Sequence, residues 1–319
     1  MDNLTHSLVG ALIGQAGLKR KTGLAMPALI IGANLPDVDA ACLLWLDGVE
    51  HLAFRRGITH GPIAWVLLPL VLAGLLYGFD RWQAKRGKRP EGRLPVRFGW
   101  LYALALIGCL THPALDWLNV YGIRLLEPFS SRWFYGDILF IIDVWLWALL
   151  GFATWFSLRR EKRGGEWRRP ARIAIAVGLA YVGINAAITW LNETTSATSG
   201  ETVIASPPPL AFWSREMLMG EAHDWYVRQE GDFPPFQAIT DQPCAWPDTD
   251  SLRQANPQLD AFLFWSRTPF AERAPDGSVL IRDARYYDPS ARDRFTVALP
   301  DVECEPLSLT AHAEEVARP

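Results

Sequence analysis

The stretch GPIAWVLLPLVLAGLLYGF, residues 61–79, decides the fold, because its 19 residues include no charged side chain. At a rise of ~1.5 Å per residue, an α-helix of this length crosses the ~30 Å hydrocarbon core of a bilayer. We therefore expect a transmembrane helix here.

Apolar stretches flank this segment on both sides. Leu24–Leu46 is long enough to span a membrane, but Asn34-Leu35-Pro36-Asp37-Val38-Asp39 interrupts it, so we expect a broken helix. Leu4–Leu18 has only 15 residues and forms either a short crossing or a re-entrant helix. The predicted fold class is an all-α polytopic membrane helical bundle of five to six spans. Its remaining spans are Phe98–Leu118, Ile138–Phe156 and Ile173–Leu191.

Charge divides the chain into two parts, although the net charge is only −3. Residues 1–191 carry 21 basic and 13 acidic side chains, whereas residues 192–319 carry 10 basic and 21 acidic ones. We predict a helical membrane domain over 1–191, a linker over 192–209, and a soluble acidic domain over 210–319. Nucleic acid is not expected as a partner, because the soluble part is acidic and loop topology explains the basic clusters.

Basic residues also predict the orientation in the membrane. Seventeen of the 21 basic residues before Asn192 lie in three short segments, residues 19–21, 80–97 and 158–172. Short loops rich in Lys and Arg stay in the cytoplasm. The connections around 47–60 and 119–137, and the C-terminal domain, are then expected on the outer, periplasmic side of a bacterial inner membrane.

The C-terminal domain is expected to be small and β-rich. Strand-type residues occupy Phe262–Trp265, Val279–Arg282 and Phe295–Leu299, and Pro275-Asp276-Gly277 has the chemistry of a hairpin turn. Cys244 and Cys304 both lie in this domain, where an oxidising compartment would permit a disulfide.

Histidine and aspartate residues gather unusually in the membrane part. In the predicted topology these residues reach one depth near the outer face, although charged and polar groups are expensive to hold in lipid. His112 and Asp116 are four residues apart, so a helix presents both on one face. His and carboxylate ligands suit zinc, or else manganese. The candidate metal ligands are His6, Asp37, Asp39, His60, His112, Asp116 and Asp143.

Each of these residues also has an ordinary structural interpretation. A lone intramembrane His or Asp can make a polar contact between helices, and His6 can lie in a solvated N-terminal turn. Asp37 or Asp39 can cap a helix. The convergence of seven such groups favours a metal site over these separate roles.

Four basic residues lie outside the three segments expected in the cytoplasm, and they are close in sequence to the candidate metal ligands. They are Arg55, Arg56, Arg124 and Arg132. A guanidinium group suits a phosphate or carboxylate, so Arg55 or Arg56 is a candidate for holding an anionic substrate group. The alternative is snorkelling to the interface or pairing with Glu127 and Asp137.

Four phrases contain or adjoin the candidate ligands: Asp2-Asn3-Leu4-Thr5-His6, Ala33 to Asp39, Arg56-Gly57-Ile58-Thr59-His60-Gly61, and Thr111-His112-Pro113 through Asp116 to Asp137. Together they resemble a family of bacterial membrane-bound metal-dependent hydrolases, the YdjM-like inner-membrane proteins. The likeness covers about residues 1–155. In much of the family a histidine precedes the Arg-Gly pair, where this chain has Arg55, so the number of metal ions is left open. A weaker likeness links the order of His and Asp to zinc-dependent phospholipases C and nucleases.

These observations predict a membrane-bound hydrolase that acts on an ester, above all a phosphoester, of a lipid or amphipathic substrate. The metal would activate water, and Asp37 or Asp143 would act as general base. Two other classes remain open. One is a transporter or channel with intramembrane His and Asp; the other is a metal-stabilised membrane scaffold without catalysis.

Overall fold

The computed structural model describes residues 1–196, 201–228, 236–288 and 291–307. The chain divides into two compact units, which are described separately. The helical unit comprises residues 1–41, 56–190 and 207–215. The C-terminal unit comprises residues 42–55 and 191–206 and the described part of 216–319.

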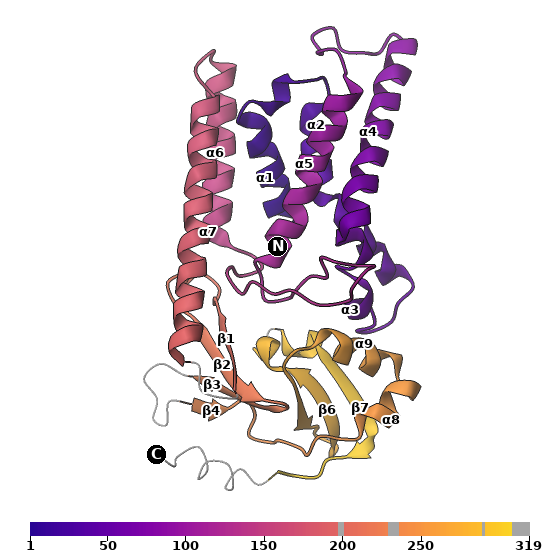
Figure 1. The fold of residues 1–319 in the computed structure, drawn as a ribbon, viewed down its shortest axis with the longest axis vertical. Coiled ribbons are helices and arrows are strands. Elements are labelled where there is room, and N and C mark those ends of the chain that lie inside the picture. Colours follow the sequence, from indigo (N-terminus) through magenta and orange to yellow (C-terminus); the bar gives the residue numbers. More distant parts are fainter. Residues whose placement is uncertain (197–200, 229–235, 289–290, 308–319) are drawn as a thin grey trace. The chain divides into compact units, whose positions relative to one another are not determined.

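Long helices that run side by side form the helical unit (Figure 1). Two buried apolar clusters hold them together: Leu29, Leu72 and Leu104 join α2, α4 and α5, whereas Leu12, Leu150 and Ala171 join α1, α6 and α7. The elements are α1 (Asn3–Gln15), α2 (Ala25–Asn34), the 3₁₀ helix η2 (Leu35–Leu44), α4 (Pro62–Lys85), α5 (Phe98–Trp117), α6 (Val144–Lys162) and α7 (Arg168–Ser196), with short 3₁₀ turns at Leu18–Arg20 and Ile58–His60.

In the part of the chain that the structure describes, four segments are long and apolar enough to cross a membrane. They are Ala25–Leu44, Pro62–Lys85, Phe98–Trp117 and Arg168–Ser196. The predicted broken helix is confirmed, because the α-helical geometry of α2 gives way to a 3₁₀ helix at Leu35. The predicted helix start at Ile138 is wrong. Asp143 accepts a hydrogen bond from the Leu146 amide and so caps α6 at Val144.

Small residues bring α2 and α5 unusually close. A side chain on Gly108 would meet the Leu29 carbonyl oxygen at 2.5 Å, and one on Gly32 would meet the Ala105 carbonyl oxygen at 2.7 Å. Neither position has room for a Cβ atom, so glycine permits backbone contact as in other membrane helix pairs. This close approach brings the end of α2, where Asp37 follows, next to the end of α5.

The segment 207–215 anchors to the ends of α6 and α7. The Arg215 guanidinium donates hydrogen bonds to the hydroxyl of Thr189 at 2.9 Å and to the backbone oxygen of Asn185 at 2.8 Å. Phe212 packs edge-on against Trp145 and Tyr181. The predicted linker therefore includes the end of α7, a strand at Thr202–Ser206 and this anchored segment, whereas residues 197–200 lie outside the described residues.

Two antiparallel sheets form the C-terminal unit (Figure 1). The first has the order β1-β2-β3-β4 and the second the order β5-β6-β7. Ile204, Trp225 and Phe270 belong to one buried cluster shared by the two sheets. The strands are β1 (Thr202–Ser206), β2 (Glu216–Glu221), β3 (Asp224–Arg228), β4 (Phe236–Ala238), β5 (Pro269–Arg273), β6 (Ser278–Asp283) and β7 (Thr296–Glu303).

Three short helices complete this unit. They are α3 (His51–Phe54), α8 (Thr249–Ala255) and α9 (Pro257–Trp265), and α3 packs against α9. The predicted strands at 279–282 and 295–299 and the turn at 275–277 are confirmed, with a one-residue shift at the start of β7. The predicted strand Phe262–Trp265 is wrong. Asn256 caps a helix whose first residue is Pro257, and this local start signal outweighs the β propensity of the aromatic residues.

Cys244 and Cys304 form a disulfide, with their Cα atoms 5.4 Å apart. The bond closes a loop across 60 residues of the C-terminal unit. Cys42 and Cys109 are buried free thiols.

Candidate metal centre

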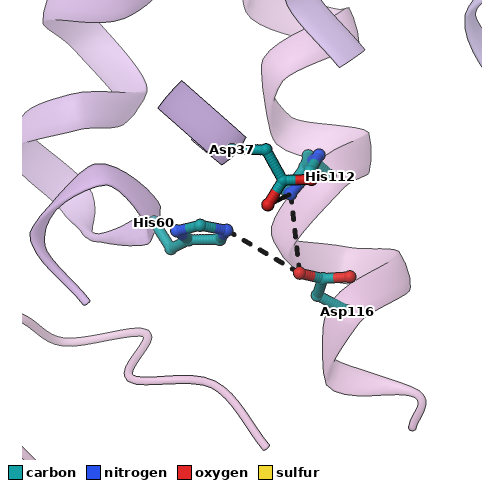
Figure 2. Close-up of side chains that lie close together, drawn as sticks. All are labelled: Asp37, His60, His112 and Asp116. Carbon is teal, nitrogen blue, oxygen red and sulfur yellow. Dashed lines mark ion pairs between the residues drawn. The ribbon is translucent and has the colours of Figure 1, made fainter. Parts of the chain in front are cut away.

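Four acidic and histidine side chains from three segments of the helical unit meet at one point (Figure 2). Asp37 lies in η2, His60 ends the 3₁₀ turn before α4, and His112 and Asp116 lie one turn apart on α5. One ligand atom from each of the four lies within 4.8 Å of the others. These residues could hold a metal ion.

The separations between the ligand atoms fit a single small ion. Asp116 Oδ2 lies 3.5 Å from His112 Nε2 and 3.7 Å from His60 Nε2, and Asp37 Oδ1 lies 3.7 Å from His112 Nε2. Two ligands that are each ~2.1 Å from zinc at a tetrahedral angle lie roughly 3.4 Å apart. These three separations are only slightly larger, and all four ligand atoms lie within 4.8 Å of one another, so side-chain shifts could close the set around an ion.

Hydrogen bonds on the far side of the rings set the tautomers of both histidines. His112 Nδ1 lies 2.7 Å from the Ala33 carbonyl oxygen, which only accepts, so the proton is on Nδ1. Nε2 then points toward the carboxylates of Asp37 and Asp116. Among the described residues, Nε2 of His60 and Nε2 of His112 are both buried without a hydrogen-bond partner. Buried polar atoms in proteins nearly always have a partner, and a metal would supply one here.

A second carboxylate supports His60 from behind. Thr59 donates its hydroxyl proton to Asp39 Oδ2 at 3.0 Å, so its oxygen can accept the proton of His60 Nδ1 at 2.9 Å. Asp39 also accepts the Arg56 amide at 2.8 Å. A carboxylate or hydroxyl behind a ligand histidine fixes its ring orientation. Burial, with His112 nearby, lowers the pKa of His60 well below its ordinary value, which favours the neutral ring that a metal needs.

His6 lies against the same centre from α1. Its ring stacks on the ring of His112, with 3.8 Å between centroids, and its Nε2 is 3.3 Å from Asp116 Oδ1. The amino group of Met1 contacts the same carboxylate oxygen. His6 is therefore in contact with the group of four without belonging to it.

Arg56 connects several parts of the centre. Its Nε pairs with Asp116 Oδ2 at 3.2 Å, and its terminal nitrogen donates to Asn119 Oδ1 at 3.1 Å. The guanidinium lies over the Tyr121 ring, 4.4 Å from its centroid. Arg56 has a left-handed backbone with φ of 55°, which a non-glycine residue adopts only when its surroundings hold it. Arg56 therefore pairs with the same Asp116 oxygen that faces the two histidine Nε2 atoms.

Two of the predicted site residues lie elsewhere. Asp143 precedes α6 rather than lying inside a span, and it accepts hydrogen bonds from the Leu146 amide and the Tyr181 hydroxyl. Arg55 ends α3 in the C-terminal unit. Sequence reasoning missed Thr59, Asn119 and the Ala33 carbonyl oxygen. Thr59 is adjacent to the predicted ligand His60, but only the fold shows which groups its hydroxyl joins.

Fold and site together define a helical membrane protein with a buried group of His and Asp residues able to bind a metal. The chain belongs to the YdjM inner membrane protein family, whose model matches residues 1–191. The matched region ends inside α7 and includes all four residues of the candidate centre. No curated protein and no solved structure matches this chain.

Proposed function

We propose that this protein is a membrane-bound, metal-dependent hydrolase of phosphoesters on amphipathic substrates. One observation carries the proposal: two histidines with fixed tautomers direct their Nε2 atoms at the same carboxylates in a buried site. A structural polar cluster would satisfy those nitrogens within the chain. Membership of an inner membrane protein family and the apolar helices support the membrane location.

The proposed roles follow from burial and position. His60, His112 and Asp116 hold the ion, a set of two histidines and one carboxylate that leaves a coordination position open. A divalent ion, zinc in the first place, supplies Lewis-acid activation of water and of the ester. The Asp37 side chain is 13 % exposed while the other three are at most 1 % exposed, so among the four it is the one that solvent reaches. Arg56 orients Asp116, and the predicted anion-holding role of Arg55 stays a prediction.

In the reaction, Asp37 accepts a proton from the attacking water. A bond forms between the water oxygen and phosphorus, and the bond from phosphorus to the leaving alcohol oxygen breaks. The proton held by Asp37 then passes to that alcohol oxygen, so Asp37 returns to the carboxylate form.

The proposal is tested by metal analysis together with turnover on phospholipid and phosphomonoester panels. Wild-type protein should contain a stoichiometric divalent metal, and His60→Ala and His112→Ala should each lose it along with activity. Asp37→Asn should retain the metal but lose about 10²- to 10⁴-fold in turnover, the usual contribution of a general base. His51→Ala, an exchange in the C-terminal unit, is the matched histidine control and should change neither quantity.

Full metal retention by both histidine variants would contradict the proposed metal centre. A metal-loaded wild type that turns over no member of either panel would instead identify the centre as structural. Elemental analysis also gives the number of ions bound per chain.

We further propose that the C-terminal unit lies on the periplasmic side. Its Cys244–Cys304 disulfide fits an oxidising compartment. Residues 42–55, from a connection predicted on the outer side, belong to the same unit, and α3 packs on α9 there. After reduction, a membrane-impermeant thiol reagent should label Cys244 and Cys304 in intact spheroplasts. Labelling only after lysis would contradict this placement.

A further inference from the structure

A groove of about 410 Å³ opens on the surface of the helical unit where α1, α2 and η2 meet. Its volume lies within the roughly 300–1,000 Å³ of typical ligand sites. Apolar side chains make most of the wall, and the exposed lining area is mainly apolar. The lining residues are Asn3, Ile30, Ile31, Asn34, Leu35, Asp37 and Val38.

Asp37 belongs both to this groove and to the candidate metal centre. His60, His112 and Asp116 are almost completely buried, whereas the Asp37 side chain retains 13 % exposure. The groove therefore reaches the centre at the same carboxylate that was assigned as general base. A molecule lying in the groove would place one end beside Asp37.

The groove also lies on a segment with the composition of a membrane span. Ile30, Ile31 and Val38 fall within Ala25–Leu44, one of the four candidate spans. Ile31 is 44 % exposed and Val38 is 54 % exposed. Large apolar side chains exposed on a membrane span face hydrocarbon, so the groove opens toward the bilayer. An acyl chain could enter it without passing through water.

We propose that the groove binds one acyl chain of a bilayer phospholipid along Ile30, Ile31, Leu35 and Val38, with the phosphoester headgroup beside Asp37. This inference rests on the proposed function, because an anionic headgroup next to a carboxylate needs a divalent cation between them. It adds the substrate's binding site and a lateral entry route from the membrane.

Photocrosslinking tests the groove without relying on turnover. Full-length, metal-loaded protein is reconstituted in phosphatidylethanolamine and phosphatidylglycerol vesicles that contain a small fraction of phosphatidic acid with a diazirine in one acyl chain. Mass spectrometry then maps the labelled residues. Labelling should concentrate at Ile31 and Val38, and Val38→Trp, which fills the groove, should reduce it about tenfold.

Val71→Trp is the matched control. Val71 lies on α4 outside the groove and is 57 % exposed, close to the 54 % of Val38. This control should leave labelling in the groove unchanged. Equal labelling of the groove and the exposed face of α4 would contradict lipid binding in the groove. Unchanged labelling in Val38→Trp would contradict it as well.

Parallel turnover assays separate failure of the groove from failure of the function. Wild type should hydrolyse both phospholipid and water-soluble p-nitrophenyl phosphate, and Val38→Trp should lose about tenfold in phospholipid hydrolysis. If Val38→Trp hydrolyses phospholipid as fast as wild type, the groove does not bind the substrate and the hydrolase proposal stands. If wild type labels in the groove but hydrolyses neither substrate, the hydrolase proposal is wrong and the lipid site stands.

Discussion

Both units bury charged side chains, yet the two sets differ in how their charges are satisfied. In the C-terminal unit, Asp283 and Arg285 have fully buried side chains and pair at 2.7 Å. Ser266 and Thr268 donate further hydrogen bonds to Asp283. In the helical unit, the His60 and His112 nitrogens face carboxylate oxygens at 3.5–3.7 Å, too far for a hydrogen bond.

The difference separates a structural cluster from a candidate binding site. A buried carboxylate is tolerated when a cation and hydrogen-bond donors surround it, as around Asp283. The helical cluster instead directs two ring nitrogens and two carboxylates at a common point, an arrangement that a divalent cation would complete. Burial of charge alone does not indicate a binding site. The convergence of potential metal-ligand atoms on one point does.

Replacement of Asp283 by Asn is expected to have the largest effect on stability. The change removes the carboxylate that pairs with the buried Arg285 guanidinium, which should lower the free energy of unfolding of the C-terminal unit by about 3–5 kcal/mol. Hydrogen exchange of the β5–β7 amides in the full-length protein measures the loss. Asp260→Asn is the control, because its ion pair with Arg253 is exposed, with 57 % and 38 % of the two side chains accessible, and should contribute at most about 1 kcal/mol.

Asp283→Asn should also alter how the stability of the C-terminal unit depends on pH. Burial raises the pKa of Asp283, but the Arg285 charge and the hydrogen bonds outweigh burial and leave the pKa below its ordinary value. The carboxylate therefore stabilises the fold above its unfolded pKa of about 3.9, and this contribution disappears as the pH falls through the lower folded value. Asp283→Asn should weaken that acid dependence. The metal content of Asp283→Asn should equal that of wild type. A loss of metal would show that the Asp283 cluster and the candidate metal centre are not independent.

Replacement of Thr59 by Val should have a smaller effect, confined to the helical cluster. The change removes the hydroxyl between Asp39 and His60 Nδ1, but Asp39 Oδ2 still lies 3.4 Å from that nitrogen. We expect metal affinity to fall about tenfold, the low end for partners behind a ligand histidine. Titration with a competing chelator measures this change. Thr111→Val, which removes a hydroxyl bonded to the Gly108 carbonyl oxygen, should leave affinity unchanged. Equal losses in both variants would show that general packing, not support of His60, sets the affinity.

Local signals in the sequence predicted much of the architecture. The uncharged stretch at 61–79 lies within α4, and the polar interruption at Asn34 marks the point where α2 becomes a 3₁₀ helix. Composition could not place the start of α6, which depends on one hydrogen bond from Leu146 to Asp143. It also misassigned residues 262–265, because aromatic residues favour a strand, whereas the cap at Asn256 starts a helix.

The sequence by itself determined that the chain has long apolar helices, an acidic β-containing C-terminal part, and a set of His and Asp residues rare in membrane segments. Only the tertiary structure decided which of these residues meet. Asp37, His60, His112 and Asp116 come together because Gly32 and Gly108 allow α2 and α5 into backbone contact, whereas Asp143 is held at a helix start. Residue type and spacing fix what a side chain can bind, but the distance between segments far apart in sequence depends on how closely their backbones pack.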